Sequence, residues 1–431
     1  MTTSTAIRPL APSEQMFAGA EIYVGYAVQV SGRLDLAALS SAYQATVRAY
    51  PVLGAGLEPA EGGNHILVSS TGVAPEISVV DGDPERLLVD PAFDQRLALS
   101  ALRVVRDGDT ASVTLLTHHS VADAYHSLAV LAQLWSCYTD VVAGQPVERD
   151  VHPYPQSVEE LLAARGIEKV ADPDAAQQKP VGAAAPDSAA VHATEPAMPE
   201  TVSADSGFVS LRTTRCHLAP AETAELVELG HREGVTINGL VSAAIMLGEA
   251  EVLGLSLTDI LLTYPVDLRS RITPPVGLTE GTNVLGFANH LSTENTGLLD
   301  LARDICESLR SGLASGTVQR TSLHMPETAG EWALAPGMVI VTNWGRVPIL
   351  RAPDDLCIND FRSTLTARGD RAGGQDPEAP VYIVSTFGGR LSIELHHPEA
   401  TTAQQQRRID AVTAKLRGAV AARTDSTRRS G

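Results

Sequence analysis

The sequence has few cysteines, and their arrangement does not suggest a disulfide scaffold. Its four cysteines, Cys137, Cys216, Cys306 and Cys357, are widely spaced and form no C-x-x-C pair. Free thiols of this kind are typical of proteins in a reducing compartment. No run approaches the roughly 20 apolar residues that span a bilayer, and the first residues lack the apolar core of a secretory signal. We therefore expect a cytoplasmic protein without a membrane span.

Positive charge is also scarce. The chain has 32 lysine and arginine residues against 51 aspartate and glutamate residues, which gives a net charge of -19 and a pI near 5.0. Proteins bind the nucleic-acid backbone through basic surfaces, and anionic membrane leaflets attract basic segments. The composition therefore argues against nucleic acids and membrane surfaces as partners.

Several catalytic signatures are missing from the sequence. It has no G-x-S-x-G stretch of serine hydrolases, no H-E-x-x-H pair of zinc proteases, and no glycine-rich stretch that binds nucleotides. We therefore expect neither a resident metal nor an organic cofactor. The chemistry is expected to come from side chains that exchange protons or bind substrate.

Length and patterning predict two domains. A chain of 431 residues with 44% hydrophobic residues is long enough for two cores of about 200 residues each. Residues 171–206 are rich in alanine, proline and acidic residues and have almost no large apolar side chains, so they bury too little surface to offset the entropy of ordering. We predict an N-terminal domain at residues 1–170, a flexible crossover linker at 171–206 and a C-terminal domain at 207–431.

Both domains show the patterns of mixed helix and sheet structure (α+β, within the broad α/β class). Alternation of apolar and polar residues recurs along the chain, and Asp35 is placed to cap a helix. The turns at Asp107-Gly108-Asp109 and Gly388-Gly389 are typical of β-hairpins. The expected strands are 22–30, 65–69, 99–105, 111–117, 261–266, 339–342, 382–387 and 391–395, and helical patterns lie at 12–20, 36–47, 128–138, 221–233, 240–252 and 298–313.

One stretch, residues 117–126 (THHSVADAYH), concentrates titratable groups at a predicted strand-to-helix turn. Adjacent residues of an extended chain point in opposite directions, so only one of His118 and His119 can face a given cavity. A histidine exchanges protons near neutral pH, which favours a general base. Asp123 is placed either to cap the following helix or to take an ion-paired or functional role.

Three blocks of the sequence resemble a known family. The stretch His118-His119-Ser120-Val121-Ala122-Asp123 resembles the His-His-x-x-x-Asp core shared by chloramphenicol acetyltransferase, plant acyl-CoA-dependent acyltransferases and condensation domains. Residues 12–17 (PSEQMF) with 34–53, and 264–269 (YPVDLR) with 282–286 (TNVLG), are similar to the polyketide-associated acyltransferases, the family of phthiocerol/phthiodiolone dimycocerosyl transferases. The resemblance covers most of the chain outside 171–206.

The resemblance implies a fold and a reaction. The expected fold has two chloramphenicol-acetyltransferase-like subdomains with a solvent channel between them. The expected enzyme is an O-acyltransferase that moves an acyl group from a thioester directly onto a hydroxyl, with His119 as general base. Its donor is an acyl carrier protein of a polyketide synthase module or acyl-CoA, which is a substrate rather than a cofactor. Its acceptor is a small-molecule alcohol, a polyketide-derived lipid or natural product.

The resemblance also assigns supporting residues. Asp123 is expected to pair with Arg269, and His118 is expected to hold the turn through a ring hydrogen bond. Asn343 and Trp344 fall in the segment that lines the channel in relatives. Ala124 occupies the position after the Asp where the family usually has glycine, which implies an ordinary helical backbone and a narrower passage.

Alternative interpretations remain for each of these residues. Arg269 also suits an ion pair with Asp267 or a solvated surface site. Asn343 and Trp344 suit a turn and an apolar core. His126 is expected at the channel wall or the surface, without an assigned role. The pair His396-His397 is expected to form a solvated strand end.

Three other functions compete with acyl transfer to a polyketide-derived alcohol. A metal hydrolase would use His118, His119, Asp123 and His126 as ligands, although two adjacent histidines at a strand end diverge. An acetyl-CoA-dependent tailoring acetyltransferase of a secondary metabolite fits the same motif. A non-catalytic condensation-like module that binds a carrier protein is the third alternative.

Overall fold

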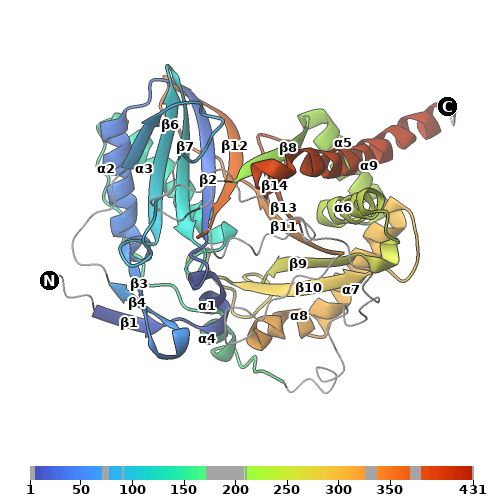
Figure 1. Cartoon of the computed structure of the whole chain (residues 1–431), viewed down its shortest axis with the longest axis horizontal. Coiled ribbons are helices and arrows are strands. Elements are labelled where there is room, and N and C mark those ends of the chain that lie inside the picture. The colour runs from blue at the N-terminus through green and yellow to red at the C-terminus, as the bar shows by residue number, and fades with distance from the viewer. Residues whose placement is uncertain are drawn as a thin grey trace, which may run out of the picture.

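The protein folds into two halves that lie side by side (Figure 1). The computed structural model describes residues 5–69, 77–89, 92–170, 208, 211–325, 337–368 and 380–429. The predicted linker at 171–206 lies outside the described residues. Each half contains one large twisted sheet with helices on it, and a third, small sheet lies at the edge of the first half.

The first half is built on a five-stranded sheet in the order β12-β2-β7-β6-β5. Helices α2 and α3 lie together on one face of this sheet (Figure 1). The small sheet has the order β1-β4-β3. The elements are β1 (Thr5–Pro9), α1 (Pro12–Ala18), β2 (Tyr23–Gly32), α2 (Leu36–Ala49), β3 (Gly56–Pro59), β4 (His65–Ser69), β5 (Ile77–Asp81), β6 (Ser100–Asp107), β7 (Thr110–His118), α3 (Ala124–Val142) and α4 (Val158–Ala163).

Local sequence signals explain where these elements begin and end. The carboxylate of Asp35 accepts hydrogen bonds from the backbone N–H groups of Ala37 and Ala38, so it caps α2 as predicted. The β6–β7 hairpin turns at Gly108 and Asp109. Gly108 has a φ of 55°, a value that glycine adopts without strain. His118 is the last residue of β7, which lies in the middle of the sheet between β2 and β6.

The second half is built on a six-stranded sheet in the order β10-β9-β11-β13-β14-β8. Helix α6 is buried in its core and packs against α7 and α9. Helix α5 ends at Gly234 with a left-handed φ of 67°, as the sequence pattern predicts. The elements are β8 (Arg212–Leu218), α5 (Pro220–Glu233), α6 (Ile237–Leu253), β9 (Leu261–Asp267), β10 (Leu285–Leu291), α7 (Leu298–Ala314), α8 (Thr317–Arg320), β11 (Met338–Arg346), β12 (Leu356–Thr366), β13 (Val381–Phe387), β14 (Arg390–His397) and α9 (Thr402–Arg429).

Strand β12 crosses from the second half into the sheet of the first half. It pairs antiparallel with β2 along its whole length, from Leu356 opposite Gly32 to Thr366 opposite Tyr23. The orange strand lies beside β2 in Figure 1. The second half of the chain therefore supplies the edge strand of the sheet in the first half. This exchange fixes the two halves to each other through backbone hydrogen bonds.

Within the described residues, no single helix is long and apolar enough to cross a membrane. Helices α5 and α6 reach that length and composition only as a pair, and they meet at a bend of 103°.

Candidate active site

His118 is the last residue of β7 and is fully enclosed. Its side chain is 0% exposed, and its Nδ1 accepts a hydrogen bond from the backbone N–H of Ser120 at 3.2 Å. The ring packs edge-on against Tyr23 with 4.8 Å between centroids. Burial, together with the neighbouring His119, lowers the pKa of His118 to about 3. It is therefore a neutral residue that ties the turn to its own strand end.

His119 is the first residue of the turn, and its backbone is fixed at both ends. Its N–H donates to the carbonyl of Ile22 at 2.8 Å, and its carbonyl accepts from Nδ2 of Asn283 at 2.8 Å. The imidazole stacks on the ring of Phe17, with centroids 3.9 Å apart and 14° between the planes. The two histidines thus lie in different surroundings, as expected for neighbours in an extended segment.

The state of the His119 ring suits a proton acceptor. Its Nδ1 is enclosed without a hydrogen-bond partner among the described residues. Burial lowers the pKa of His119 below its ordinary value, and hydrogen bonding and the charge of Asp123 offset part of that effect. The imidazole is therefore neutral at neutral pH.

Helix α1, which carries Phe17, is locked to the histidine turn by the buried Glu14. Arg8 donates to both carboxylate oxygens of Glu14 at 2.7 Å, and the hydroxyl of Thr282 donates to one of them at 2.7 Å. The hydroxyl of Ser120 donates to the backbone carbonyl of Glu14 at 2.8 Å. The position of the Phe17 ring is thus set by contacts to both halves of the molecule. The sequence pattern alone indicates no role for Phe17 or Glu14, although both lie in the 12–17 block that resembles the family.

Asp123 and Arg269 form a buried ion pair that joins the halves. Two guanidinium nitrogens of Arg269 donate to the two carboxylate oxygens at 2.8 and 3.0 Å, and the side chains are only 2% and 4% exposed. Asp123 also accepts from the backbone N–H of His126 at 3.0 Å, so it caps α3 as well. Arg269 contacts Asp267 at 3.0 Å. The cap and both ion pairs proposed as alternatives therefore exist together.

Residues 281–284 of the second half wrap around the histidine turn. Thr282 accepts the N–H of Asp123 at 2.9 Å, Asn283 binds the carbonyl of His119, and the N–H of Val284 donates to Asp123 at 3.1 Å. The turn is therefore held in place by the facing half as well as by its own local hydrogen bonds.

His126 lies inside this arrangement, so the surface alternative is wrong, while a place on the channel wall stays a prediction. It is 1% exposed, and its Nδ1–H donates to the carbonyl of Gly281 at 3.1 Å. Burial lowers the pKa of His126 to about 4. Because Asp123 caps α3, the helix turns the His126 ring toward the second half rather than toward solvent.

The predicted channel residues make no contact with His119 among the hydrogen bonds and ring contacts of the described residues. Asn343 donates through Nδ2 to Asn238 at 3.0 Å. Trp344 is 5% exposed and packs against Tyr26 in the core of the first half, with ring centroids 4.9 Å apart. Ala124 begins α3 with an ordinary helical backbone. A role for these three residues in a channel wall stays a prediction.

The expectation that His396 and His397 form a solvated strand end is wrong. They are 8% and 3% exposed. The ring of His396 hydrogen-bonds Ser363 at 2.8 Å and Thr213 at 3.1 Å, and the ring of His397 hydrogen-bonds Thr214 at 2.7 Å. Strand β8 pairs with β14 along the whole length of β8, so β14 is an inner strand of the sheet. His396 lies opposite Thr213, and His397 lies opposite Arg212.

The described residues contain no group of three or more His, Cys, Asp or Glu side chains arranged to hold a metal ion. Asp123, which the metal hydrolase alternative would use as a ligand, is instead engaged by Arg269 and by two backbone N–H groups.

Comparison with known proteins supports a family assignment. Residues 208–396 match the family model described as "Phthiocerol/phthiodiolone dimycocerosyl transferase C-terminus". The chain is 33% identical over 410 residues to the phthiocerol/phthiodiolone dimycocerosyl transferase of Mycobacterium leprae (strain TN), covering 92% of this chain and 93% of that protein. It is also 33% identical over 425 residues to the enzyme of the same name from Mycobacterium sp. (strain JLS), with 97% and 98% covered.

The chain belongs to the phthiocerol/phthiodiolone dimycocerosyl transferase family. It is therefore an acyltransferase, which confirms the predicted class of enzyme. The structure of polyketide synthase associated protein 5 from Mycobacterium tuberculosis matches it with a TM-score of 0.79 and 31% identity, covering 96% of this chain and 99% of that one. The first condensation domain of the calcium-dependent antibiotic synthetase shares the fold at a TM-score of 0.66 and 14% identity, with 96% and 97% covered. These matches confirm the predicted fold of two chloramphenicol-acetyltransferase-like halves.

Proposed function

We propose that the protein is an O-acyltransferase in which His119 is the general base. The observation that carries this proposal is the position of one neutral imidazole, that of His119, which elements of both halves hold in place. Phe17 covers one face of the ring, and Asn283 fixes the backbone of His119 from the facing half. Such rigid placement on a scaffold is what proton transfer at a defined atom requires.

In the proposed reaction the acyl group passes directly from thioester to alcohol. Nε2 of His119 removes the hydroxyl proton as the alcohol oxygen attacks the thioester carbonyl carbon. The tetrahedral intermediate then collapses, the C–S bond breaks, and the departing sulfur takes the same proton back from Nε2. An ester and a thiol are formed, and the imidazole returns to its neutral state. General-base assistance of this kind contributes roughly 10²–10⁴-fold to the rate.

The supporting residues act on His119 rather than on the substrates. During the reaction the ring becomes transiently positive, and the face of Phe17 and the charge of Asp123 favour that state. The Asp123–Arg269 pair holds the turn against the second half, and His118 closes the turn through Ser120. We further propose that the two substrates reach His119 through a solvent channel between the halves.

We propose an acyl thioester, carried on coenzyme A or on the acyl carrier protein of a polyketide synthase, as the donor. The acceptor is an alcohol on a polyketide-derived lipid or natural product. Support comes from the relatives, whose names describe transfer of a mycocerosyl group to phthiocerol or phthiodiolone, and from a neighbouring structure described as associated with polyketide synthase. The thioester is a substrate in this scheme, and no resident cofactor takes part. A tailoring acetyltransferase that uses acetyl-CoA is the variant of this proposal with the shortest donor.

A substrate panel tests the proposal. Purified protein is incubated with acyl-CoA thioesters of graded chain length, and with the same acyl groups on a carrier protein, in the presence of simple long-chain alcohols. Mass spectrometry then measures ester formation. We expect ester product with at least one donor and no acyl group on the protein itself. A stable acyl adduct on the protein, or thioester loss without ester, would contradict direct transfer.

A further inference from the structure

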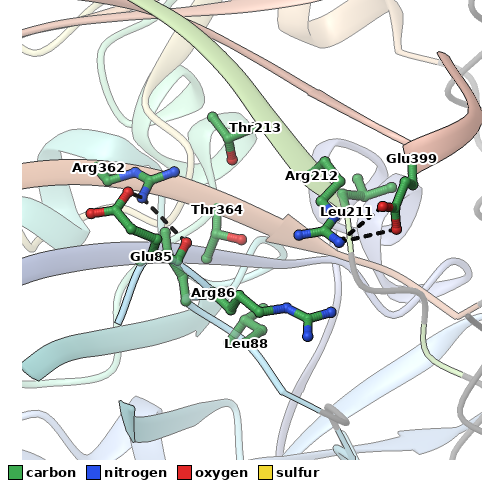
Figure 2. A pocket seen from close by; sticks show the side chains of 10 residues that line it. Glu85, Arg86, Leu88, Leu211, Arg212, Thr213, Arg362, Thr364 and Glu399 are labelled. Atoms are coloured by element: carbon green, nitrogen blue, oxygen red, sulfur yellow. Dashed lines mark hydrogen bonds and ion pairs between the residues drawn. The ribbon is translucent and has the colours of Figure 1, made fainter. Parts of the chain in front are cut away.

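A cavity of about 270 Å³ lies on the seam between the two halves (Figure 2). Residues 85–88 of the first half form one wall, and residues 211–213 at the start of β8, Arg362 and Thr364 of β12, and Glu399 form the rest. None of the residues around His119 lines it. The cavity is therefore a second feature of the molecule, separate from the candidate active site.

The cavity gathers positive charge in a strongly acidic protein. Three arginines, Arg86, Arg212 and Arg362, and two glutamates, Glu85 and Glu399, line it. Three positive charges less two negative charges leave a surplus of one positive charge, whereas the whole chain carries -19. A local excess of this sign attracts an anion.

Arg362 lines the cavity, and its positive charge is hydrogen-bonded to one carboxylate, that of Glu85. Arg362 is buried, and it donates through one nitrogen to Glu85 at 2.6 Å, but the Glu85 side chain is itself 62% exposed. Nε of Arg362 has no hydrogen-bond partner in the part of the chain that the structure describes. Burial and the neighbouring Arg215 lower the pKa of Arg362, and the charges of Glu394, Glu85 and Asp360 offset only part of that effect. A buried cation with a solvated partner gains from a further negative charge nearby.

The other two arginines also have donors to spare. Arg212 binds both oxygens of Glu399 at 3.0 Å through a single nitrogen, which leaves its remaining N–H groups free of described partners. The side chain of Arg86 makes no hydrogen bond or ion pair with any described residue, and Figure 2 shows its guanidinium apart from both glutamates. Each guanidinium has five N–H donors, so donors outnumber the acceptors supplied by the two carboxylates.

We propose that this cavity binds the phosphate group of a small phosphate ester. Guanidinium groups match the oxygens of phosphate in charge and in geometry, and the hydroxyl-bearing Thr213 and Thr364 line the same space. The side chains of Leu88 and Leu211 supply an apolar wall for the organic part of the ligand. The volume lies below the range of about 300–1,000 Å³ typical of drug-sized ligands, which selects a small molecule.

Binding there has a structural consequence. The ligand contacts Arg86 of the first half and Arg212 of the second half, so it bridges the seam that β12 crosses. A ligand that binds only the folded protein raises its thermal stability by mass action. The inference does not depend on the acyl transfer reaction.

Titration calorimetry on the full chain tests the inference with two probes, phenyl phosphate and inorganic phosphate, at constant ionic strength in chloride. We expect saturable binding of one equivalent, tighter for phenyl phosphate, and a matching rise in the melting temperature. Arg86→Gln and Arg212→Gln should each weaken binding by about tenfold or more, the effect of losing a hydrogen bond to a charged group. Arg86 is exposed and has no described partner, so its removal leaves the fold intact.

Arg407→Gln is the matched control, because Arg407 is exposed on α9, makes no hydrogen bond or ion pair in the described part of the chain, and loses the same charge. Equal weakening in Arg407→Gln and Arg86→Gln would overturn the inference, since it would show a general charge effect. The absence of saturable binding would overturn it as well. Benzoate binding as tightly as phenyl phosphate would refute the selection for phosphate, and equal affinity for the two phosphate probes would refute the organic part of the ligand.

Discussion

Replacing Asp123 by alanine tests the junction that holds the histidine turn. The change leaves the guanidinium of Arg269, 4% exposed, without its bidentate partner. Breaking a buried ion pair by removing one partner costs about 3–5 kcal/mol, and the lost cap of α3 adds about 1 kcal/mol. Burial alone lowers the pKa of Arg269, but the charges of Asp123 and Asp267 raise it above its usual value. The guanidinium stays charged after the substitution, because arginine is not deprotonated in proteins, and it keeps its contacts to Asp267 at 3.0 Å and to the carbonyl of Leu278 at 3.1 Å.

Because Arg269 keeps its contacts to Asp267 and Leu278, we expect Asp123→Ala to destabilise the protein by about 3 to 4 kcal/mol. Urea unfolding with an unchanged m-value measures the loss. Asp267→Asn is the matched control, since Asp267 is 24% exposed and touches the same arginine; it should cost about 1 kcal/mol or less. The double variant Asp123→Leu, Arg269→Met removes both charges and should recover part of the loss. A cost for Asp123→Ala no larger than that of Asp267→Asn would refute the reasoning.

Three further predictions follow from the same region and from the second half. Because the pKa of His119 lies below its ordinary value of about 6.5, kcat/KM should rise with pH through an apparent pKa below 6.5 and then stay level; an acidic limb at 7 or above would contradict this. Phe17→Leu should lower kcat by about 2- to 10-fold at unchanged KM, whereas Phe17→Tyr should keep the rate; equal rates for all three proteins would show that the stack has no role. His118, His126 and His396 have folded-state pKa values of about 3, 4 and 3, so the unfolded chain binds more protons below pH 6.5. Their contribution to stability is complete above pH 6.5 and is lost as the pH falls, at about 1.4 kcal/mol per histidine per pH unit. Urea unfolding at pH 7 and 5.5 measures this slope, which His126→Gln should reduce by the share of one histidine, about 1.4 kcal/mol per pH unit below 6.5; an unchanged slope would count against it.

The local parts of this site are readable from the sequence. The alternation before His118 and the apolar helical spacing after Asp123 place the histidine pair at a strand-to-helix turn, and the structure has that turn. Opposite orientations of His118 and His119 follow from backbone geometry. The α2 cap at Asp35 and the hairpin at Gly108 depend on residues within three positions of each other. Signals of this range are contained in a single sequence.

The long-range parts are not readable in the same way. Nothing in the 356–366 segment specifies that it pairs with β2, more than 300 residues earlier in the chain, because the strand pattern is the same for either sheet. The burial of His396 depends on β8 pairing beside β14 in the same sheet and on Ser363 of β12, which hydrogen-bonds its ring. Phe17 reaches His119 because Glu14 is bound by Thr282 of the other half and by Ser120 of the histidine turn. These features arise from packing between segments that are distant in the sequence. Local periodicity carries no information about which distant segments pack together.

The most direct test of the central claim is a single-turnover measurement of ester formation by His119→Ala. The donor and alcohol are the best pair from the substrate panel, and His231→Ala is the control, since His231 is 72% exposed on α5. We predict that His119→Ala folds with an unchanged urea midpoint but forms ester about 10²–10⁴-fold more slowly, while His231→Ala matches the wild type. Ester formation by His119→Ala at the wild-type rate would contradict the account.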